Sequence, residues 1–408
     1  MKVEIDRMDH QGRGIGVIEG KTTFIPNALP GEVVEVAIIN NKKKYMVGEV
    51  LKVLESSDHR IKPICPYFTR CGGCDLMHLS YHDQLIYKED KVKDIVQKFA
   101  GINADVVKPI IACDTSLHYR NKVTFHSDHK IGFYEKKSRE IVAIDQCKIA
   151  LPRINHILAK LKILPLNHIQ QMVIRTNERT DDTMVIIQAM GEIDDKLFVD
   201  SLKEDVTSII KIMNSRITVL YGPKQIKMTL GAHTFWLSPT SFFQVNSKQC
   251  ERLYEQVRQY ANINHQDTVL DLYCGTGTIG IYLSKYAKHV YGIEINQAAI
   301  ACAKENKKLN HITNITFQAG DVGHVIKQLN IQPDVVVVDP PRSGLDRATK
   351  EQLLKWQPRT IVYVSCDPIT LARDLKELSL QYHIEAITPV DMFPQTYHVE
   401  CVCVLKIR

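Results

Sequence analysis

The carboxyl-terminal part of the chain shows a regular alternation of two hydrophobic patterns, which begins near residue 240. Short apolar runs rich in β-branched residues are typical of buried parallel strands, and the longer stretches between them carry apolar residues at helical spacing. Strands are expected at 268–272, 290–295, 315–318, 334–338, 361–365, 384–388 and 399–406, and helices at 247–261, 278–287, 297–310, 322–329, 346–356 and 369–379. This pattern predicts a doubly wound α/β sheet. No helix separates the last two strands, so the final strand is expected to be antiparallel, because a parallel return needs a longer crossover.

Residues 1–54 show a different pattern, in which short segments of alternating apolar and polar residues are separated by glycine and proline. Such segments predict a small OB-like β-barrel, a fold that often binds nucleic acids. Residues 40–45, Asn-Asn-Lys-Lys-Lys-Tyr, join two of the expected strands. Lysines beside an aromatic residue can follow a phosphate backbone, but a solvated hairpin loop has the same composition.

The chain between these two regions mixes both patterns. A helix is expected over 80–100, where Ser80 and Asp83 resemble a capping box. Its apolar face is expected to consist of Leu85, Ile86, Val92, Ile95, Val96 and Phe99. Further strands are expected at 116–125, 130–145, 172–190 and 216–237, and helices at 149–162 and 194–210. The middle region is therefore predicted to be mixed α+β.

The length and composition are those of a multidomain globular protein. A chain of 408 residues exceeds one ordinary hydrophobic core, so two or three domains are expected. The net charge of +6 permits a nucleic-acid partner without requiring one. The amino terminus, MKVEIDRMDH, lacks the apolar segment of a secretory signal, and no apolar run reaches the roughly 20 residues of a membrane span. We expect a cytoplasmic location, no membrane contact and no obligate protein partner.

The 11 cysteines of such a chain indicate metal binding or catalysis rather than disulfides. Three of them, Cys65, Cys71 and Cys74, form a C-x5-C-x2-C pattern that includes two glycines. A four-coordinate site needs a fourth thiolate, and Cys147, which follows a strand-like run, is the candidate. Four thiolates suit either zinc or an iron–sulfur cluster, and cysteines without any ligand are the remaining alternative.

The first strand of the α/β region runs into DLYCGTGTIG, residues 271–280. This turn matches G-x-G-x-x-G, and Glu294 follows at the end of the next strand. The glycines allow close backbone approach to a ligand, and a carboxylate at that place can hold ribose hydroxyls. Both features suit any adenosine-containing cofactor, so a nicotinamide-dependent oxidoreductase is one alternative.

Three reactive side chains lie at the ends of later strands: Asp339 in DPPR, Cys366 in SCDP and Glu400 in HVEC. Ligands bind at the carboxyl ends of the strands in an open α/β sheet, so we expect these groups to converge beside the cofactor. One thiol and two carboxylates around a cleft suit covalent catalysis with proton abstraction. Taken singly, they can also be a turn cap, a core thiol and a strand end. Arg342 stands where an aromatic residue would indicate methylation of an adenine amine.

The motifs DLYCGTGTIG, DPPR, SCDP and HVEC, in this order, resemble those of the S-adenosylmethionine-dependent RNA uracil-5-methyltransferase family. SFFQVN, residues 241–246, is similar to that family's motif before its catalytic domain. The N-terminal barrel resembles a TRAM domain, and the cysteine pattern resembles the 4Fe–4S site of the ribosomal RNA branch. The resemblance implies a Rossmann-like class I methyltransferase sheet. It also implies three domains, formed by residues 1–54, by 55–76 with 109–240, and by 77–108 with 241–408.

The resemblance further implies a role for each candidate residue. Cys366 is then the nucleophile that adds to C6 of a flipped-out uracil, Glu400 removes the C5 proton, and Asp339 holds the polar edge of the base. The residues implied to bind S-adenosylmethionine are Gln244, Tyr273, Glu294, Asp321 and Asp339, and those implied to hold the cluster are Cys65, Cys71, Cys74 and Cys147. The implied substrate is 23S ribosomal RNA, with transfer RNA as the alternative. A non-catalytic RNA-binding or cluster-sensing protein remains if Cys366 and Glu400 are idle.

Overall fold

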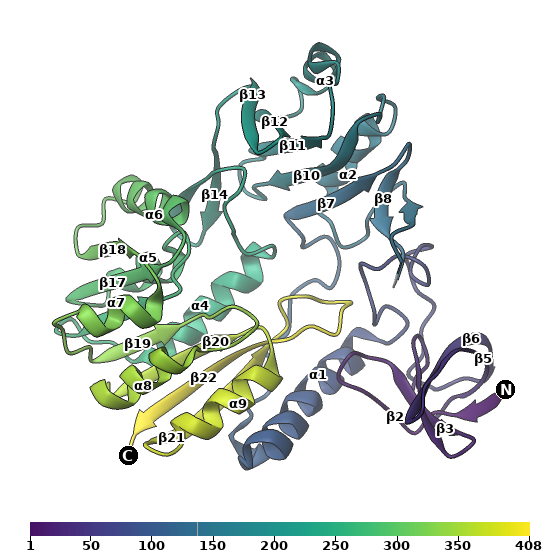
Figure 1. The fold of residues 1–408 in the computed structure, drawn as a ribbon, viewed down its shortest axis with the longest axis horizontal. Coiled ribbons are helices and arrows are strands. Elements are labelled where there is room, and N and C mark those ends of the chain that lie inside the picture. The colour runs from purple at the N-terminus through teal and green to yellow at the C-terminus, as the bar shows by residue number, and fades with distance from the viewer. Residues whose placement is uncertain (137) are drawn as a thin grey trace.

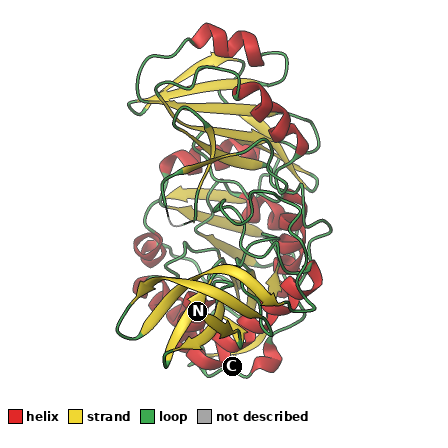
Figure 2. Cartoon of the chain, turned by 90° about the vertical axis from the view of Figure 1, so that its right-hand side faces the viewer, coloured by secondary structure: helices red, strands yellow, loops and turns green. Residues whose placement is uncertain are grey.

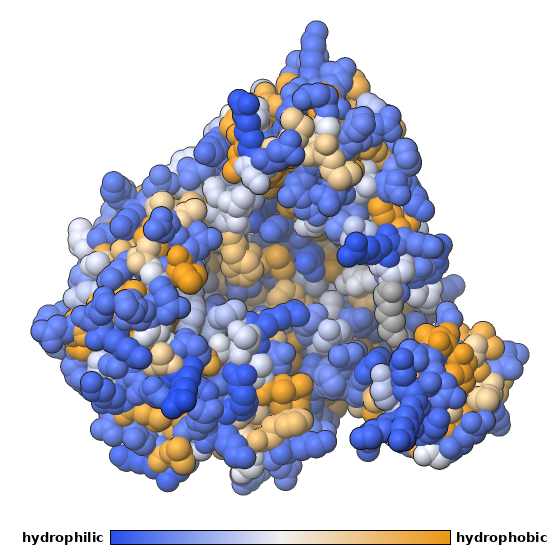
Figure 3. All heavy atoms as spheres, viewed as in Figure 1, coloured by the Kyte–Doolittle hydropathy of each residue, from blue (hydrophilic) through white to orange (hydrophobic). Residues whose placement is uncertain are grey.

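The computed structural model describes residues 1–136 and 138–408. In this part of the chain the strands form a six-stranded N-terminal sheet, a seven-stranded central sheet, a two-stranded hairpin and a second seven-stranded sheet. The three larger units occupy the corners of an open, triangular molecule (Figure 1). On the face drawn in Figure 3, the molecule is hollowed between them.

The N-terminal unit is built from strands alone, and in Figure 2 these strands curve around the N-terminus. They are β1 (Lys2–Glu4), β2 (Arg7–Met8), β3 (Gly14–Ile18), β4 (Lys21–Ile25), β5 (Val33–Asn41) and β6 (Tyr45–Glu55), in the sheet order β1-β5-β6-β4-β3-β2. The amide of Asp6 donates to Ile15 O at 2.9 Å, which ties the end of β1 to β3. A Cβ atom at Gly16 would lie 2.4 Å from Glu4 O, so glycine is needed for these strands to approach. The expected small all-β domain is confirmed.

The central unit is a mixed sheet with two helices on one face. Its elements are β7 (Lys122–Ser127), β8 (Ile131–Tyr134), β9 (Ile141–Ala143), α2 (Pro152–Leu161), β10 (Ile169–Thr176), β11 (Thr183–Ala189), α3 (Asp195–Leu202), β12 (Ser208–Met213) and β13 (Arg216–Tyr221), in the sheet order β13-β12-β11-β10-β7-β8-β9. The apolar sides of α2 and α3 pack on Phe125, Ile174 and Val185. The mixed α+β prediction is confirmed. Residue 137, within the predicted stretch 130–145, lies outside the described residues.

The helix predicted over 194–210 is wrong in its second half. The helix ends at Leu202, and Ser208–Met213 is strand β12. Ile209 and Ile210 are both fully buried, and they belong to hydrophobic clusters on opposite faces of the sheet. A β-branched run that is buried on both faces favours a strand, and this burial comes from distant segments: α2 and α3 on one face and the two-stranded hairpin, residues 226–237, on the other.

The carboxyl-terminal unit is the doubly wound sheet. Its elements are α4 (Ser247–Ala261), β16 (Thr268–Leu272), α5 (Thr278–Ser284), β17 (His289–Glu294), α6 (Gln297–Leu309), β18 (Ile315–Ala319), α7 (Val322–Gln328), β19 (Val335–Val338), α8 (Arg347–Trp356), β20 (Thr360–Ser365), α9 (Pro368–Leu378), β21 (Tyr382–Val390) and β22 (Glu400–Ile407). The strand order is β18-β17-β16-β19-β20-β22-β21. β22 is antiparallel to both of its neighbours, so the predicted α/β fold and its antiparallel last strand are confirmed.

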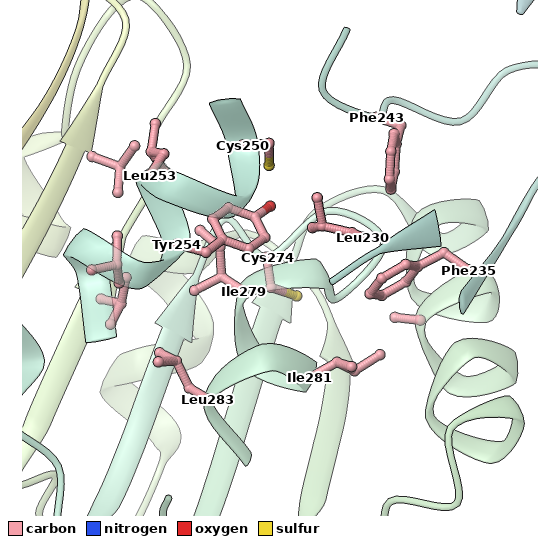
Figure 4. Packing of buried hydrophobic residues seen from close by; sticks show 14 of the residues in the cluster. Leu230, Phe235, Phe243, Cys250, Leu253, Tyr254, Cys274, Ile279, Ile281 and Leu283 are labelled. Atoms are coloured by element: carbon pink, nitrogen blue, oxygen red, sulfur yellow. The ribbon is translucent and has the colours of Figure 1, made fainter. Parts of the chain in front are cut away.

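Hydrophobic clusters cover both faces of this sheet. One cluster joins α4 and α5 to the hairpin β14 (Ile226–Leu230) and β15 (His233–Leu237), as Figure 4 shows for Tyr254, Ile279 and Phe235. The cluster on the other face includes residues of α8 and α9 and of the earlier helix α1 (Tyr81–Ile95). Within residues 1–136 and 138–408, no helix has the length and apolar character that crossing a membrane requires.

The predicted apolar face of α1 is only partly correct. Val92, Ile95 and Val96 are buried, but Ile86 and Phe99 are each 47% exposed. The buried positions nearer the start of the helix are the polar residues Gln84 and Lys88. The helix continues beyond Ile95 as a π-helical turn, Val96–Ala100, and a short 3-10 helix follows at Ala104–Val106.

Candidate active site

The carboxyl edge of the doubly wound sheet brings together the three reactive side chains. β20 and β22 are antiparallel, with Ser365 opposite Cys401. The next pair in this register is Cys366 and Glu400, so the thiol and the carboxylate leave neighbouring strands at the same edge. β19 lies parallel to β20 on its other side, and Asp339 directly follows β19.

The electrostatics of this edge are those of buried, mutually repelling acids. Glu400 is 5% exposed, and burial together with Asp339 raises its pKa to about 8. Burial raises the pKa of Asp339 to about 7. The pKa of the Cys366 thiol rises to about 11, first through burial and then through Glu400 and Asp339. The positive charge of the Arg342 guanidinium lowers the pKa of both Glu400 and Cys366 and so offsets part of these increases. DPPR signals that an arginine is present, but the sequence does not indicate that its charge reaches both groups.

The glycine-rich turn after β16 is built for close approach to a ligand. Gly275 and Gly277 have positive φ angles of 53° and 82°, and a Cβ at Gly277 would lie 2.5 Å from the Phe317 ring. Asp271 is fully buried beneath the turn and accepts a hydrogen bond from Gly280 N at 2.8 Å. Its other oxygen, Oδ1, has no partner among the described residues, and burial raises the pKa of this carboxyl to about 8. The backbone of this turn, with two glycines at positive φ, fits a site for an adenosine-containing cofactor.

Two of the predicted cofactor residues border this turn, and a third lies at the same sheet edge. Glu294 Oε2 accepts from Gly275 N at 3.2 Å. The Tyr273 hydroxyl donates to Asp346 at 2.9 Å, so a cofactor contact would fall to the tyrosine ring. Asp321 is exposed just after β18, where its side chain caps α7. That capping bond alone accounts for an aspartate at this position.

The central sheet holds the segment that carries Gln244. Asn121, directly before β7, makes two hydrogen bonds to this segment. Its side-chain amide donates to Gln244 O at 3.0 Å and to Ser247 Oγ at 2.8 Å. The buried Arg175 guanidinium donates to Ser241 O at 2.6 Å. The roles of Asn121 and Arg175 were not predictable from the sequence, because their partners lie far away along the chain and no local motif marks them.

The four predicted cluster cysteines line one cavity of about 460 Å³. Burial, and to a smaller extent the neighbouring thiols of Cys147 and Cys65, raise the pKa of Cys71 to about 11. Burial also raises the pKa of Cys74. The same cavity is lined by four cationic side chains, Arg120, Lys122, Lys148 and Arg342. Because Arg342 belongs to the DPPR turn, the cavity extends from the cysteines toward the carboxyl edge of the sheet. In the part of the chain that the structure describes, no three His, Cys, Asp or Glu side chains are grouped so as to hold a metal ion.

Comparisons with known proteins agree with this architecture. Residues 228–408 match the tRNA (Uracil-5-)-methyltransferase family, and residues 1–51 match the TRAM domain. The chain is 36% identical to an uncharacterized RNA methyltransferase of Halalkalibacterium halodurans, covering 100% of this chain and 97% of the relative. It is 39% identical to one of Clostridium tetani, covering 98% and 95%.

A solved structure shares the whole fold. It is the Pyrococcus abyssi tRNA (uracil-54, C5)-methyltransferase in complex with S-adenosyl-L-homocysteine, with a TM-score of 0.80, 29% identity and coverage of 99% of this chain and 100% of that one. These likenesses remove the nicotinamide oxidoreductase alternative. With its glycine-rich turn, its converging thiol and carboxylates and its N-terminal TRAM domain, this chain belongs to the S-adenosylmethionine-dependent RNA uracil-5-methyltransferase family.

Proposed function

We propose that the enzyme methylates C5 of a uridine in 23S ribosomal RNA through a covalent bond between Cys366 and C6 of the base. The observation that carries this proposal is the antiparallel register of β20 and β22, which makes Cys366 and Glu400 neighbours. Uracil C5 is a weak nucleophile on its own, and addition of a thiolate to C6 turns it into an enolate carbon. A second group at the same edge then has to take the C5 proton, and Glu400 is suitably located.

In the proposed reaction, the Cys366 thiolate forms a bond to C6, and the electron pair of the C5–C6 double bond moves into an enolate. S-adenosylmethionine, when bound, supplies the methyl group that C5 takes. Glu400 then accepts the C5 proton. The electrons of the C5–H bond restore the double bond, and the C6–S bond breaks to return the Cys366 thiolate. Asp339 holds the polar edge of the uracil, and the Arg342 charge, which favours both anions, assists thiolate formation.

The proposed cofactor site consists of Gln244, Tyr273, Glu294 and Asp321, with Asp339 at its border. Glu294 has the best support, because its carboxylate already sits at the glycine turn and can accept from ribose hydroxyls. Asp321 has the weakest support, since its side chain already caps α7.

We further propose that Cys65, Cys71, Cys74 and Cys147 hold a 4Fe–4S cluster. Four thiolates are a ligand set that suits either a single zinc ion or an iron–sulfur cluster. A 4Fe–4S cluster takes one thiolate at each iron, so its four sulfurs stand around a larger body. The four thiols line one cavity, and the preference for the cluster over zinc rests on the resemblance of the cysteine pattern to that of the ribosomal RNA branch. Such a cluster would cross-link segments that are far apart in the sequence and stabilise the cationic end of the cavity.

The domain division that we propose follows the resemblance: residues 1–54, residues 55–76 with 109–240, and residues 77–108 with 241–408. Support comes from α1, which packs in one hydrophobic cluster with the doubly wound sheet although it precedes the central unit in the chain. The proposed RNA substrate is consistent with action in the cytoplasm.

The preference for ribosomal RNA rests on the cysteine pattern. Transfer RNA is the second candidate, because the Pyrococcus abyssi tRNA (uracil-54, C5)-methyltransferase matches 99% of this chain in structure. Mapping of 5-methyluridine in both RNA classes, in cells with and without this protein, tests the choice. Loss of a 5-methyluridine from 23S RNA supports the first candidate, and loss from transfer RNA alone replaces it with the second.

A further inference from the structure

The loop that joins β21 to β22 is buried although it contains no regular secondary structure. Asp391 and Met392 are fully buried, and Gln395 is 6% exposed. The loop leads directly into Glu400, the first residue of β22. Val390, the last residue of β21 before the loop, lies opposite Glu400 in the sheet register. A buried loop needs hydrogen-bond donors for its carbonyl groups, because an unpaired polar group away from water destabilises the folded protein.

Helix α1 supplies those donors from one polar face. Lys88 Nζ donates to Phe393 O at 3.0 Å and forms an ion pair of 2.5 Å with Asp391 Oδ1, in which both side chains are fully buried. Tyr81 donates to the other Asp391 oxygen at 2.8 Å. Lys91 Nζ donates to the carbonyl of residue 397 at 2.8 Å. Tyr81, Lys88 and Lys91 share one face of α1, because residues at multiples of three or four positions lie on the same side of a helix. This side is polar because it bonds to the buried loop.

Gln395 connects the loop to a third segment. Its amide donates to Gln84 Oε1 and its side chain accepts from Gln84 Nε2, both at 3.0 Å. Its carbonyl accepts from the amides of Asp75 at 2.9 Å and Leu76 at 3.0 Å, directly after Cys74. Gln395 also has a positive φ of 71°, which is costly for a residue with a side chain and requires such support.

We propose that Lys88, Asp391 and the Gln84–Gln395 pair are positioning residues for Glu400, so that α1 fixes the loop from which the general base emerges. This inference rests on the proposed function, in which Glu400 removes the C5 proton. None of the four side chains is placed among the groups that meet the uracil. They act through the loop backbone, which starts after Val390, opposite Glu400, and is bonded at Gln395 to the cysteine segment.

A misplaced base has a specific kinetic consequence. Addition of Cys366 and transfer of the methyl group precede proton removal, so they do not depend on the exact place of Glu400. Release of the product does depend on it. Methylated RNA therefore stays bonded to Cys366 when the base is displaced, whereas a merely less stable protein loses active molecules without accumulating this adduct.

The test uses the full-length protein, uridine-containing substrate RNA and S-adenosylmethionine labelled in its methyl group. The variant Lys88→Met/Asp391→Asn removes both charges, because a single change would leave an unpaired buried charge. Gln84→Met, which removes the paired hydrogen bonds and keeps the side-chain length, carries the test if the double variant does not fold. The matched control is Arg359→Met/Asp267→Asn, which removes a 2.5 Å ion pair of the same sheet at its opposite edge.

Single-turnover reactions are followed by methyl transfer to RNA and by the protein–RNA adduct on denaturing gels. We expect release from the α1 variants to slow by about 10- to 100-fold, the effect of a misplacement of ~1 Å, while methyl transfer falls far less. The adduct then accumulates in these variants, as in Glu400→Gln, and not in the control. An equal fall of methyl transfer and release without adduct overturns the positioning role. Wild-type protein that forms no adduct with 5-fluorouridine RNA overturns the covalent function itself.

Discussion

The substitution Glu400→Gln should stabilise the free protein, and increasingly so as the pH rises. Burial raises the pKa of Glu400 from its ordinary 4.5 to about 8, so the folded protein holds this proton more tightly than the unfolded chain does. Between these two values the unfolded chain gives up the proton and the folded protein keeps it. The contribution of Glu400 to the free energy of unfolding is therefore highest at low pH, where Glu400 is protonated in both states, and it falls as the pH rises through about 8.

The size of this effect follows from the shift. Each pKa unit corresponds to about 1.4 kcal/mol, so ionising the buried Glu400 removes up to about 5 kcal/mol of unfolding free energy above pH 8. Glutamine has nearly the same shape and cannot ionise. The difference between the two proteins is thus expected to be small near pH ~5 and to reach several kcal/mol near pH ~9.

Urea unfolding followed by circular dichroism measures this difference at both pH values. Glu385→Gln is the matched control, because Glu385 lies exposed on the neighbouring strand β21. The reasoning is refuted if wild type and Glu400→Gln lose stability in parallel between the two pH values. A difference that appears equally in Glu385→Gln refutes it as well, since burial would then not be the cause.

Three further predictions concern the other parts of the site. Cys366→Ala should abolish methyl transfer and the adduct with 5-fluorouridine RNA while circular dichroism stays unchanged; normal methylation by this variant contradicts the covalent mechanism. Gly277→Ala places a Cβ 2.5 Å from the Phe317 ring at a positive φ, so it should cost about 1–3 kcal/mol in urea unfolding and weaken calorimetric binding of S-adenosylmethionine; unchanged binding contradicts the role of the turn. Cys74→Ser should lower the iron content of protein purified without oxygen, and zinc found in place of iron would contradict the cluster.

The carboxyl-terminal sheet was predictable from sequence because its signals are local. Helix α4 spans Ser247–Ala261, the expected range, and β16 and β17 differ from expectation by no more than one residue at either end. Long β-branched runs with helical stretches between them leave few other folds open. Motifs at the strand ends then fall at one edge by topology, which is why Cys366, Asp339 and Glu400 could be expected together.

Features that depend on distant contacts were not predictable. The apolar pattern suggested that Ile86 and Phe99 face the core of the protein. Nearer the start of α1 the buried face is instead polar, because it contacts the loop before β22, where Lys88 bonds to Asp391 across 303 positions of sequence. Arg175 and Asn121 support the Gln244 segment from the central sheet and carry no local motif. The helix predicted over 194–210 likewise ran into strand β12 (Ser208–Met213), where burial on both faces of the sheet decides the structure.

The antiparallel last strand brings the proposed nucleophile, Cys366, and the proposed base, Glu400, to one edge of the sheet. β22 has 8 residues, so its ends lie about 24 Å apart at ~3.4 Å per residue. A parallel β22 would place Glu400 beside the start of β20, at the far edge from Cys366. Reversal of the strand brings its first residue to the end of β20, and it makes the preceding loop run along the active edge. That loop must then be buried, and its polar groups bond to the polar face of the early helix α1. The position of the proposed base, Glu400, is thereby connected to segments near the other end of the sequence.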